Sequence, residues 1–265
     1  MLAGVIGWPV AHSLSPRIHM AAAKAVGIEM DYSAIEVEPG KALAALDTMR
    51  REGIRGYSVT MPHKEAVLTG LDGLTASASA LGAVNHITNT DGHLVGNNTD
   101  GDGFVLGFEH SCGQSILDKS VGVIGSGGAA RAIIEASFRH GASSVVVVAR
   151  SPERAAIAAS LARERGRVGS WTDLNTLDVV VNATPVGMAN TAGENQTVVD
   201  VDQLGEQTIV VDIVYNPRDT PLLVAARNRG LATVEGVTML VGQAAEQFTA
   251  WTGIEAPLDD MFDVV

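Results

Sequence analysis

The chain is poor in the features that mark secreted and membrane-spanning proteins. Among its 265 residues there is one cysteine, Cys112, which excludes an internal disulfide framework and is typical of a reducing compartment. No apolar run approaches the length of a transmembrane helix. The N-terminal apolar run lacks a basic segment and is interrupted by Gly4, Gly7 and Pro9, so no signal peptide is expected. These absences predict a cytoplasmic protein.

Basic residues are also scarce. The chain has 18 Lys and Arg against 30 Asp and Glu, a formal net charge of −12, which argues against nucleic acid or an anionic membrane as partner. A small anionic ligand stays compatible if its site is locally positive. The seven histidines show no metal-ligand spacing, so no metal is expected. The chain lacks the Gly-x-Ser-x-Gly motif of serine hydrolases, so that class of enzyme is not expected. Monomer and homodimer both remain open.

Strand and helix patterns alternate along the chain, which predicts an α/β fold with mostly parallel sheets. We expect two units with a cleft between them. The first is an N-terminal α/β unit over residues 1–101, and the second begins at residue 102. The expected strands are Leu2–Ile6, Tyr32–Val37, Tyr57–Thr60, Asn85–Thr90, His93–Gly96, Val121–Gly125, Ser144–Ala149, Asp178–Asn182, Thr208–Ile213 and Ala232–Glu235. The expected helices start near Ser15, Lys41, Lys64, Thr75, Asp100, Ala129, Pro152, Pro221 and Thr238, and the one from Pro152 is expected to reach Arg165. Asp91-Gly92, between the strands Asn85–Thr90 and His93–Gly96, predicts a hairpin with a primed turn.

A glycine-rich turn stands at the centre of the second unit. Gly125, Gly127 and Ala130 form Gly-x-Gly-x-x-Ala between an apolar strand and a helix, the context in which this fingerprint predicts dinucleotide binding. The first glycine permits the tight turn, and the second lets the backbone approach a pyrophosphate at the helix N-terminus. The alternative is an ordinary glycine-rich turn between a strand and a helix.

The next strand predicts NADP rather than NAD. It ends at Ala149-Arg150-Ser151, with Arg154 one helical turn later and no acidic residue to take a ribose 2′-hydroxyl. Guanidinium groups fit a 2′-phosphate in bidentate geometry. The alternative, two solvated arginines at a helix start, is weakened because cations there oppose the helix dipole.

Three loops of the first unit carry candidate groups for chemistry. Ser13 and Ser15 precede a helix and either cap it, with Ser15 as N-cap, or hold a carboxylate. Lys64 follows a strand, and Asp100 opens a helix. Separately they read as a solvated lysine and a helix cap, but together they form an acid–base pair for a carbonyl or alcohol oxygen. His12 and His63 are secondary candidates in the same loops.

Eight stretches, in this order, resemble the shikimate dehydrogenase family. They are Gly7–Pro16, Ser58–Lys64, Gly82–Asn85, Asn98–Gly101, Gly125–Arg131, Asn182–Met188, Asp212–Pro217 and Gly236–Ala245. The resemblance covers essentially the whole chain. It implies an N-terminal α/β substrate domain over residues 1–101, joined by C-terminal helices over 237–265, and a Rossmann-like NADP-binding domain over residues 102–236, with a cleft between them. It implies NADPH-dependent, reversible reduction of 3-dehydroshikimate to shikimate, a step in the biosynthesis of chorismate and the aromatic amino acids.

The resemblance also implies the role of each site residue. Lys64 and Asp100 become the proton-transfer pair. The substrate-binding residues become Ser13, Ser15, Thr60, Asn85, Asn98, Tyr215 and Gln243. The cofactor-binding residues become Gly125, Ser126, Gly127, Gly128, Ala129, Ala130, Arg131, Arg150, Ser151, Arg154, Thr184, Val214 and Gly236.

Three positions depart from the family pattern, because Ser58 replaces a frequent Asn, Asn97 a frequent Asp, and Ala149 a frequent Asn. Two rival functions remain. One is a quinate or dual quinate/shikimate dehydrogenase, against which Ser15 and Arg150 argue. The other is a non-catalytic NADP-binding sensor, which needs neither Lys64 nor Asp100.

Overall fold

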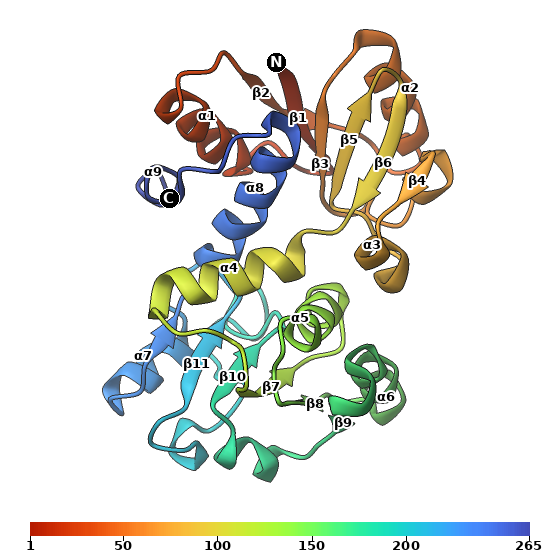
Figure 1. Cartoon of the computed structure of the whole chain (residues 1–265). Coiled ribbons are helices and arrows are strands. Elements are labelled where there is room, and N and C mark those ends of the chain that lie inside the picture. Colours follow the sequence, from red (N-terminus) through yellow and green to blue (C-terminus); the bar gives the residue numbers. More distant parts are fainter. The chain divides into compact units, whose positions relative to one another are not determined.

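The computed structural model describes residues 1–265, which form two compact units. The terminal unit comprises Met1–Thr99 and Val241–Val265, and the central unit comprises Asp100–Leu240 (Figure 1). The sequence predicts the boundaries between the units after residues 101 and 236, whereas the structure has them after residues 99 and 240. No helix has both the length and the apolar character needed to cross a membrane.

The terminal unit is built on a mixed six-stranded sheet in the order β2-β1-β3-β5-β6-β4. The strand β1 pairs in parallel with β2 and β3, whereas β5 runs antiparallel to β3 and β6. The antiparallel part departs from the mostly parallel sheet that we expected. The strands are β1 Leu2–Gly7, β2 Asp31–Glu36, β3 Gly56–Val59, β4 Gly73–Leu74, β5 His86–Thr90 and β6 His93–Asn97.

Strand register brings four loops to one edge of this sheet. Ile6 pairs with Val59, Ser58 pairs with His86, and His86 pairs with Asn97. The carboxyl ends of β1, β3 and β6 therefore meet the amino end of β5. Every candidate loop of the first unit leaves the sheet at this edge.

The helices of the terminal unit cover a buried core. That core includes Ile6, Leu46, Met49, Tyr57 and Ile87. The helical segments are α1 Ser15–Ala25, α2 Ala42–Glu52, the 3₁₀ helix η1 Leu68–Gly70, α3 Ala76–Leu81 and α9 Leu258–Phe262, together with most of α8 Val237–Thr252.

Glycine is required where α8 meets β3. A Cβ atom at Gly56 would lie 2.1 Å from the Trp251 ring. The indole Nε1 donates to the Ile87 carbonyl over 3.1 Å. The missing side chain of Gly56 therefore seats the last turn of α8 on the sheet.

The central unit contains an all-parallel sheet in the order β12-β11-β10-β7-β8-β9. Counted from β7, this is the 3-2-1-4-5-6 order of a dinucleotide-binding fold, which reverses between β7 and β10. Its strands are β7 Ser120–Ile124, β8 Ser144–Val148, β9 Gly166–Val168, β10 Val179–Asn182, β11 Ile209–Asp212 and β12 Thr233–Val234. Its helical segments are α4 Asp100–Cys112, α5 Gly128–Arg139, α6 Pro152–Ala159, α7 Pro221–Asn228 and the 3₁₀ helices η2 Ser160–Arg165, η3 Trp171–Thr176 and η4 Val201–Gln203.

Two predicted helices were wrong in extent. The stretch after Lys64 forms turns instead of a helix: the Lys64 carbonyl accepts the Val84 N–H over 2.8 Å, and the Leu68 N–H donates to the Glu65 carbonyl over 3.2 Å. The helix predicted over Pro152–Arg165 ends at Ala159 and continues as η2, within which Arg163 has a φ of 49°.

The predicted hairpin with a primed turn was confirmed. β5 and β6 pair in antiparallel register, and the two turn residues, Asp91 and Gly92, have φ angles of 52° and 89°. Both angles are positive, as a type I′ turn requires.

Candidate active site

The two serines of the first candidate loop lie against each other at the start of α1. The Ser13 Oγ accepts the Ser15 N–H over 3.2 Å and donates to the Ser15 Oγ over 3.1 Å. The N-cap of α1 is Leu14, so the expectation that Ser15 caps the helix was wrong. Ser13 satisfies the Ser15 amide, which puts Ser15 inside the first helical turn.

Lys64 and Thr60 lie in the loop after β3. The Thr60 N–H donates to the Ile6 carbonyl over 3.0 Å, which ties the end of β3 to β1. The Lys64 carbonyl holds Val84, and the Lys64 side chain is partly exposed. His63 is buried, with its Nε2 within 2.7 Å of the Val37 carbonyl, so it has a structural role, whereas His12 is exposed.

Asn85 and Thr99 form a buried pair beside this loop. The Asn85 Oδ1 accepts the Thr99 N–H over 2.7 Å, and the Asn85 Nδ2 donates to the Thr99 Oγ1 over 3.1 Å. Asn98, also buried, donates from Nδ2 to the Ala83 carbonyl over 3.0 Å. Thr99 is the residue before Asp100, where α4 begins, so Asp100 lies in the first turn of that helix.

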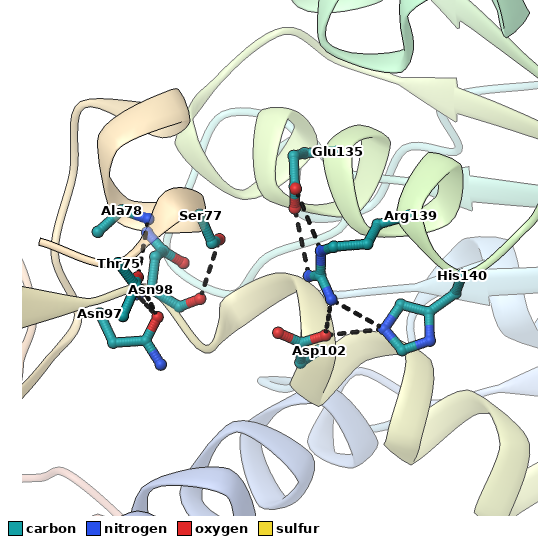
Figure 2. Close-up of polar contacts among 9 residues, drawn as sticks. All are labelled: Thr75, Ser77, Ala78, Asn97, Asn98, Asp102, Glu135, Arg139 and His140. Atoms are coloured by element: carbon teal, nitrogen blue, oxygen red, sulfur yellow. Dashed lines mark hydrogen bonds and ion pairs between the residues drawn. The ribbon is translucent and has the colours of Figure 1, made fainter.

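Polar side chains fix the chain just before Asp100. The Asn97 Oδ1 accepts from the Thr75 Oγ1 over 2.6 Å and from the Asn98 N–H over 2.8 Å. Ser77 donates to the Asn98 carbonyl over 3.3 Å (Figure 2). This arrangement leaves Asn97, at one of the departures from the family pattern, in a hydrogen-bonding role.

The first turn of α4 is in turn bonded to α5 within the central unit. The Asp102 Oδ1 lies 2.6 Å from the Arg139 Nη1 and 2.8 Å from the His140 Nε2, and Arg139 also pairs with Glu135 (Figure 2). Burial alone would raise the pKa of Asp102, but the hydrogen bonds from His140 and Arg139 hold that pKa below its usual range.

Gln243 lies on α8 in the terminal unit. Its backbone carbonyl accepts from the Thr99 Oγ1 over 3.2 Å, and its Oε1 accepts from the Gln247 Nε2 over 2.6 Å. Gln247 belongs to none of the candidate motifs, although its side chain is fully buried. Its place four residues after Gln243, on the same helix face, was the one available signal.

The glycine turn of the central unit follows β7. Gly125 has a φ of 126°, and a Cβ there would lie 2.7 Å from the Ala183 carbonyl oxygen. Ideal Cβ positions at Gly127 and Gly128 have no heavy atom within 4 Å. Gly127 is the N-cap of α5. The start of that helix is therefore uncovered, as the binding of a pyrophosphate requires. The nearby Arg131 Nε is buried and without a hydrogen-bond partner.

The loop after β8 carries two unpaired cations. Arg150 and Arg154 are exposed, and neither guanidinium makes an ion pair or hydrogen bond. Ser151 caps α6 by accepting the Arg154 N–H over 3.3 Å, and it donates to Glu153 over 2.8 Å. Two guanidinium groups without carboxylate partners suit a phosphate ligand.

The remaining cofactor candidates end neighbouring strands of the same sheet. The Thr184 Oγ1 donates to the Asn182 Oδ1 over 2.7 Å after β10, and the Val214 N–H donates to the Asp212 Oδ1 over 3.0 Å after β11. A Cβ at Gly236, after β12, would lie 2.4 Å from the Val214 carbonyl oxygen. These residues and the glycine turn share the carboxyl edge of the sheet, where ligands bind in such folds.

The structure thus collects most of the substrate-binding and proton-transfer candidates in the terminal unit. These are Ser13, Ser15, Thr60, Lys64, Asn85, Asn98 and Gln243, whereas Asp100 and the half-exposed Tyr215 belong to the central unit. No group of three or more His, Cys, Asp or Glu side chains is arranged to hold a metal ion.

Strand order, the glycine turn and the unpaired arginines define the central unit as a dinucleotide-binding fold of the kind used by nicotinamide-dependent oxidoreductases. Family models extend this class to the whole chain. Residues 5–87 match the shikimate dehydrogenase substrate binding domain, 109–237 match shikimate / quinate 5-dehydrogenase, and 236–265 match the shikimate 5′-dehydrogenase C-terminal domain. The chain belongs to the shikimate dehydrogenase family.

Individual relatives match over most of their length. The chain is 40% identical to the shikimate dehydrogenase (NADP(+)) of Moorella thermoacetica, over 97% of this chain and 90% of that protein. The crystal structure of shikimate 5-dehydrogenase from Thermus thermophilus, in complex with NADP(H) and shikimate, has a TM-score of 0.90 and 33% identity, covering 100% and 98% of the two chains. Quinate dehydrogenase from Corynebacterium glutamicum in complex with NAD has a TM-score of 0.89 and 33% identity, covering 100% and 98%.

Proposed function

We propose that this chain catalyses the NADP-dependent, reversible reduction of 3-dehydroshikimate to shikimate, and so serves the biosynthesis of chorismate and aromatic amino acids. The observation that carries this proposal is the shared sheet edge of the terminal unit. The loops with Ser13, Lys64, Asn85 and Asn98 all leave the sheet there. Relatives across the full length are shikimate dehydrogenases that use NADP(+), which supports the same reaction here.

Recognition of the substrate falls to hydroxyl and amide groups. The two serine hydroxyls at the start of α1 take the substrate carboxylate, because a helix N-terminus favours a negative charge. The remaining polar side chains bind the hydroxyl groups of the ring: Thr60, Asn85, Asn98, Tyr215 and Gln243.

Proton transfer falls to Lys64 and Asp100. In the direction of reduction, the Lys64 Nζ delivers a proton to the carbonyl oxygen as that oxygen becomes a hydroxyl, and its positive charge stabilises the developing alkoxide. In the direction of oxidation, the pair removes the proton from the same oxygen. NADPH supplies the hydride when bound.

The residues of the central unit fit NADP. Open space lies above Gly127 and Gly128 at the start of α5, which suits the pyrophosphate. The guanidinium groups of Arg150 and Arg154 suit the 2′-phosphate. The further contacts assigned to the cofactor come from Gly125, Ser126, Ala129, Ala130, Arg131, Ser151, Thr184, Val214 and Gly236.

The partners follow from this reaction. They are small molecules, and a formal net charge of −12 disfavours nucleic acid. We place the protein in the cytoplasm because its single cysteine suits a reducing compartment. Monomeric and homodimeric forms both agree with the proposal.

A second candidate is quinate oxidation with NAD, favoured by the similarity to the quinate dehydrogenase of Corynebacterium glutamicum. Ser15 and the unpaired Arg150 argue for shikimate and NADP. A non-catalytic NADP sensor is the third reading.

The test is to measure NADPH binding and the reduction of 3-dehydroshikimate on the same purified protein. The proposal expects both. Tight NADPH binding without turnover would establish the sensor instead.

A further inference from the structure

One buried carboxamide of the terminal unit joins several parts of the candidate substrate site. Gln247 lies on α8, and its Nε2 points at three oxygen acceptors: the Gln243 Oε1 at 2.6 Å, the Thr99 Oγ1 at 3.2 Å and the Asn85 carbonyl at 3.4 Å. Its Oε1 accepts a short hydrogen bond from the Ser58 Oγ. The side chain is 0% exposed, so these contacts take the place of water.

A chain of hydroxyl groups fixes the orientation of this amide. The Ser58 Oγ lies 2.7 Å from the Tyr32 hydroxyl. Because the single proton of Ser58 goes to Gln247, the Tyr32 hydroxyl donates to Ser58. Burial raises the pKa of Tyr32 far above its ordinary value, so this donor stays protonated. His19 stacks on the Tyr32 ring with centroids 4.3 Å apart, which holds the phenol in place.

The contacts of Gln247 lead directly to the groups assigned to substrate. Asn85 and Gln243 are two of those groups, and Thr99 precedes Asp100. From this geometry, and resting on the proposed function, we infer that Gln247 is a positioning residue for substrate binding. It sets the side chain of Gln243 and the backbone around Asn85 and Thr99 without touching substrate itself. The Nε2 donor carries this role, since all three of its neighbours present oxygen.

Two variants separate positioning from packing. Gln247→Glu keeps the shape and the acceptor for Ser58 but removes the Nε2 donor, and Gln247→Met removes both polar atoms. We expect each to raise the KM for shikimate about tenfold, the effect of losing one or two buried neutral hydrogen bonds. The KM for NADP+ should stay within about twofold, since the contacts of Gln247 lie in the terminal unit. Thr249→Ala, on the exposed side of the same helix, is the matched control and should change neither constant.

Two further measurements distinguish a positioning role of Gln247 from a role in packing. In a Gln243→Ala background, the added effect of Gln247→Met on the KM for shikimate should shrink, because the two side chains act as one unit. For Gln247→Glu, the KM defect relative to wild type should shrink as the pH falls, because protonation of the introduced carboxyl group restores one donor.

Two results would contradict the positioning role of Gln247. An unchanged KM for shikimate in Gln247→Glu, with only a lower melting temperature, would make Gln247 a purely structural residue. Equal increases in the KM for shikimate and for NADP+ would also overturn the inference. Wild-type turnover is measured first, so a failure of the proposed reaction is recognised before any variant is compared.

Discussion

The backbone carbonyl of Lys64 joins two loops, whereas its side chain is the proposed proton-transfer group. The carbonyl accepts the Val84 N–H, where the local sequence predicts a helical bond to Leu68. The bond to Val84 also joins the loop after β3 to the segment that carries Asn85. The backbone that carries the Lys64 side chain is thereby fixed beside the other polar groups of this sheet edge, as the proposed role in proton transfer requires.

We therefore predict that Lys64→Ala lowers kcat by about 10²–10⁴-fold, the range for a positioned acid–base group, with a smaller change in the KM for shikimate. Steady-state kinetics with shikimate and NADP+ measure both constants. Lys41→Ala, at an exposed lysine just before α2, is the control and should behave as wild type. A kcat close to wild type in Lys64→Ala would remove the lysine from the mechanism.

Arg150 tests the cofactor assignment in the same way. Its guanidinium has no partner in the protein, so its removal leaves no buried charge behind. We predict that Arg150→Ala raises the KM for NADP+ about 10- to 100-fold, the loss of a charge-assisted contact of about 1.5–3 kcal/mol. The KM for NAD+ should stay nearly constant. Arg51→Ala, at an exposed arginine of α2, should change neither. Equal effects on both cofactors would contradict a 2′-phosphate contact.

Residue patterns predicted these loops but not the side chains that support them. Short motifs around Ser13, Lys64 and Gly125 have fixed spacings, so they are visible in a linear sequence. Gln247 and Tyr32 have no such spacing relative to Ser58, because the fold alone brings them together. For the same reason the expectation for His63 was undecided until its bond to the Val37 carbonyl was known.

Among elements, periodicity predicted the long strands and helices and missed several of the short ones. β4, β9 and α9 have two, three and five residues, too few to show a pattern of their own. η2 replaced the end of a predicted helix because Gly166 turns back against Ala159, where a Cβ would lie 2.0 Å from the carbonyl oxygen. Such close approaches depend on tertiary packing rather than on local propensity.

Packing of α1, β2, β5 and α8 buries two histidines without charge. His19 lies between Tyr32 and Trp251, and neither of its ring nitrogens has a hydrogen-bond partner. His86 packs edge-on to Trp251. Burial lowers the pKa of each to about 3, against about 6.5 in the unfolded chain.

These shifts make the free energy of unfolding depend on pH. Below pH 6.5 the unfolded chain binds more protons than the folded one, so stability is complete above pH 6.5 and is lost as the pH falls toward 3. Each histidine contributes a slope of at most about 1.4 kcal/mol per pH unit. We predict that His19→Phe, which keeps a stacked ring, removes the contribution of His19 to this slope.

Urea unfolding of both proteins at several pH values between 7.5 and 4.5 measures this slope. His93→Gln, at an exposed histidine of β6, is the control and should keep the wild-type slope. An unchanged slope in His19→Phe would mean that His19 is charged in the folded protein or does not titrate differently on unfolding.

At the scale of the whole molecule, each of the two sheets has its candidate site loops at one edge, although one sheet is mixed and the other is parallel. In the terminal unit the site loops gather where β1, β3 and β6 end, and in the central unit they gather where β7, β8, β10, β11 and β12 end. Alternation of strand and helix patterns was enough to predict the α/β class. The antiparallel pairing of β5 was visible only through its hairpin turn.

The net charge of the whole molecule bears on the kind of ligand that it binds. A chain with a formal net charge of −12 binds an anionic cofactor only where nearby groups make the local electrostatic potential positive. The start of α5 and the unpaired Arg150 and Arg154 provide such a place in the central unit. The protein as a whole therefore favours a small anion bound at a defined site over an extended polyanion.

The reaction itself is the central claim, and one set of rates tests it. The values of kcat/KM are measured for shikimate and quinate, each with NADP+ and with NAD+, on the wild-type protein. We predict the highest value for shikimate with NADP+. Faster turnover of quinate with NAD+ would contradict the account.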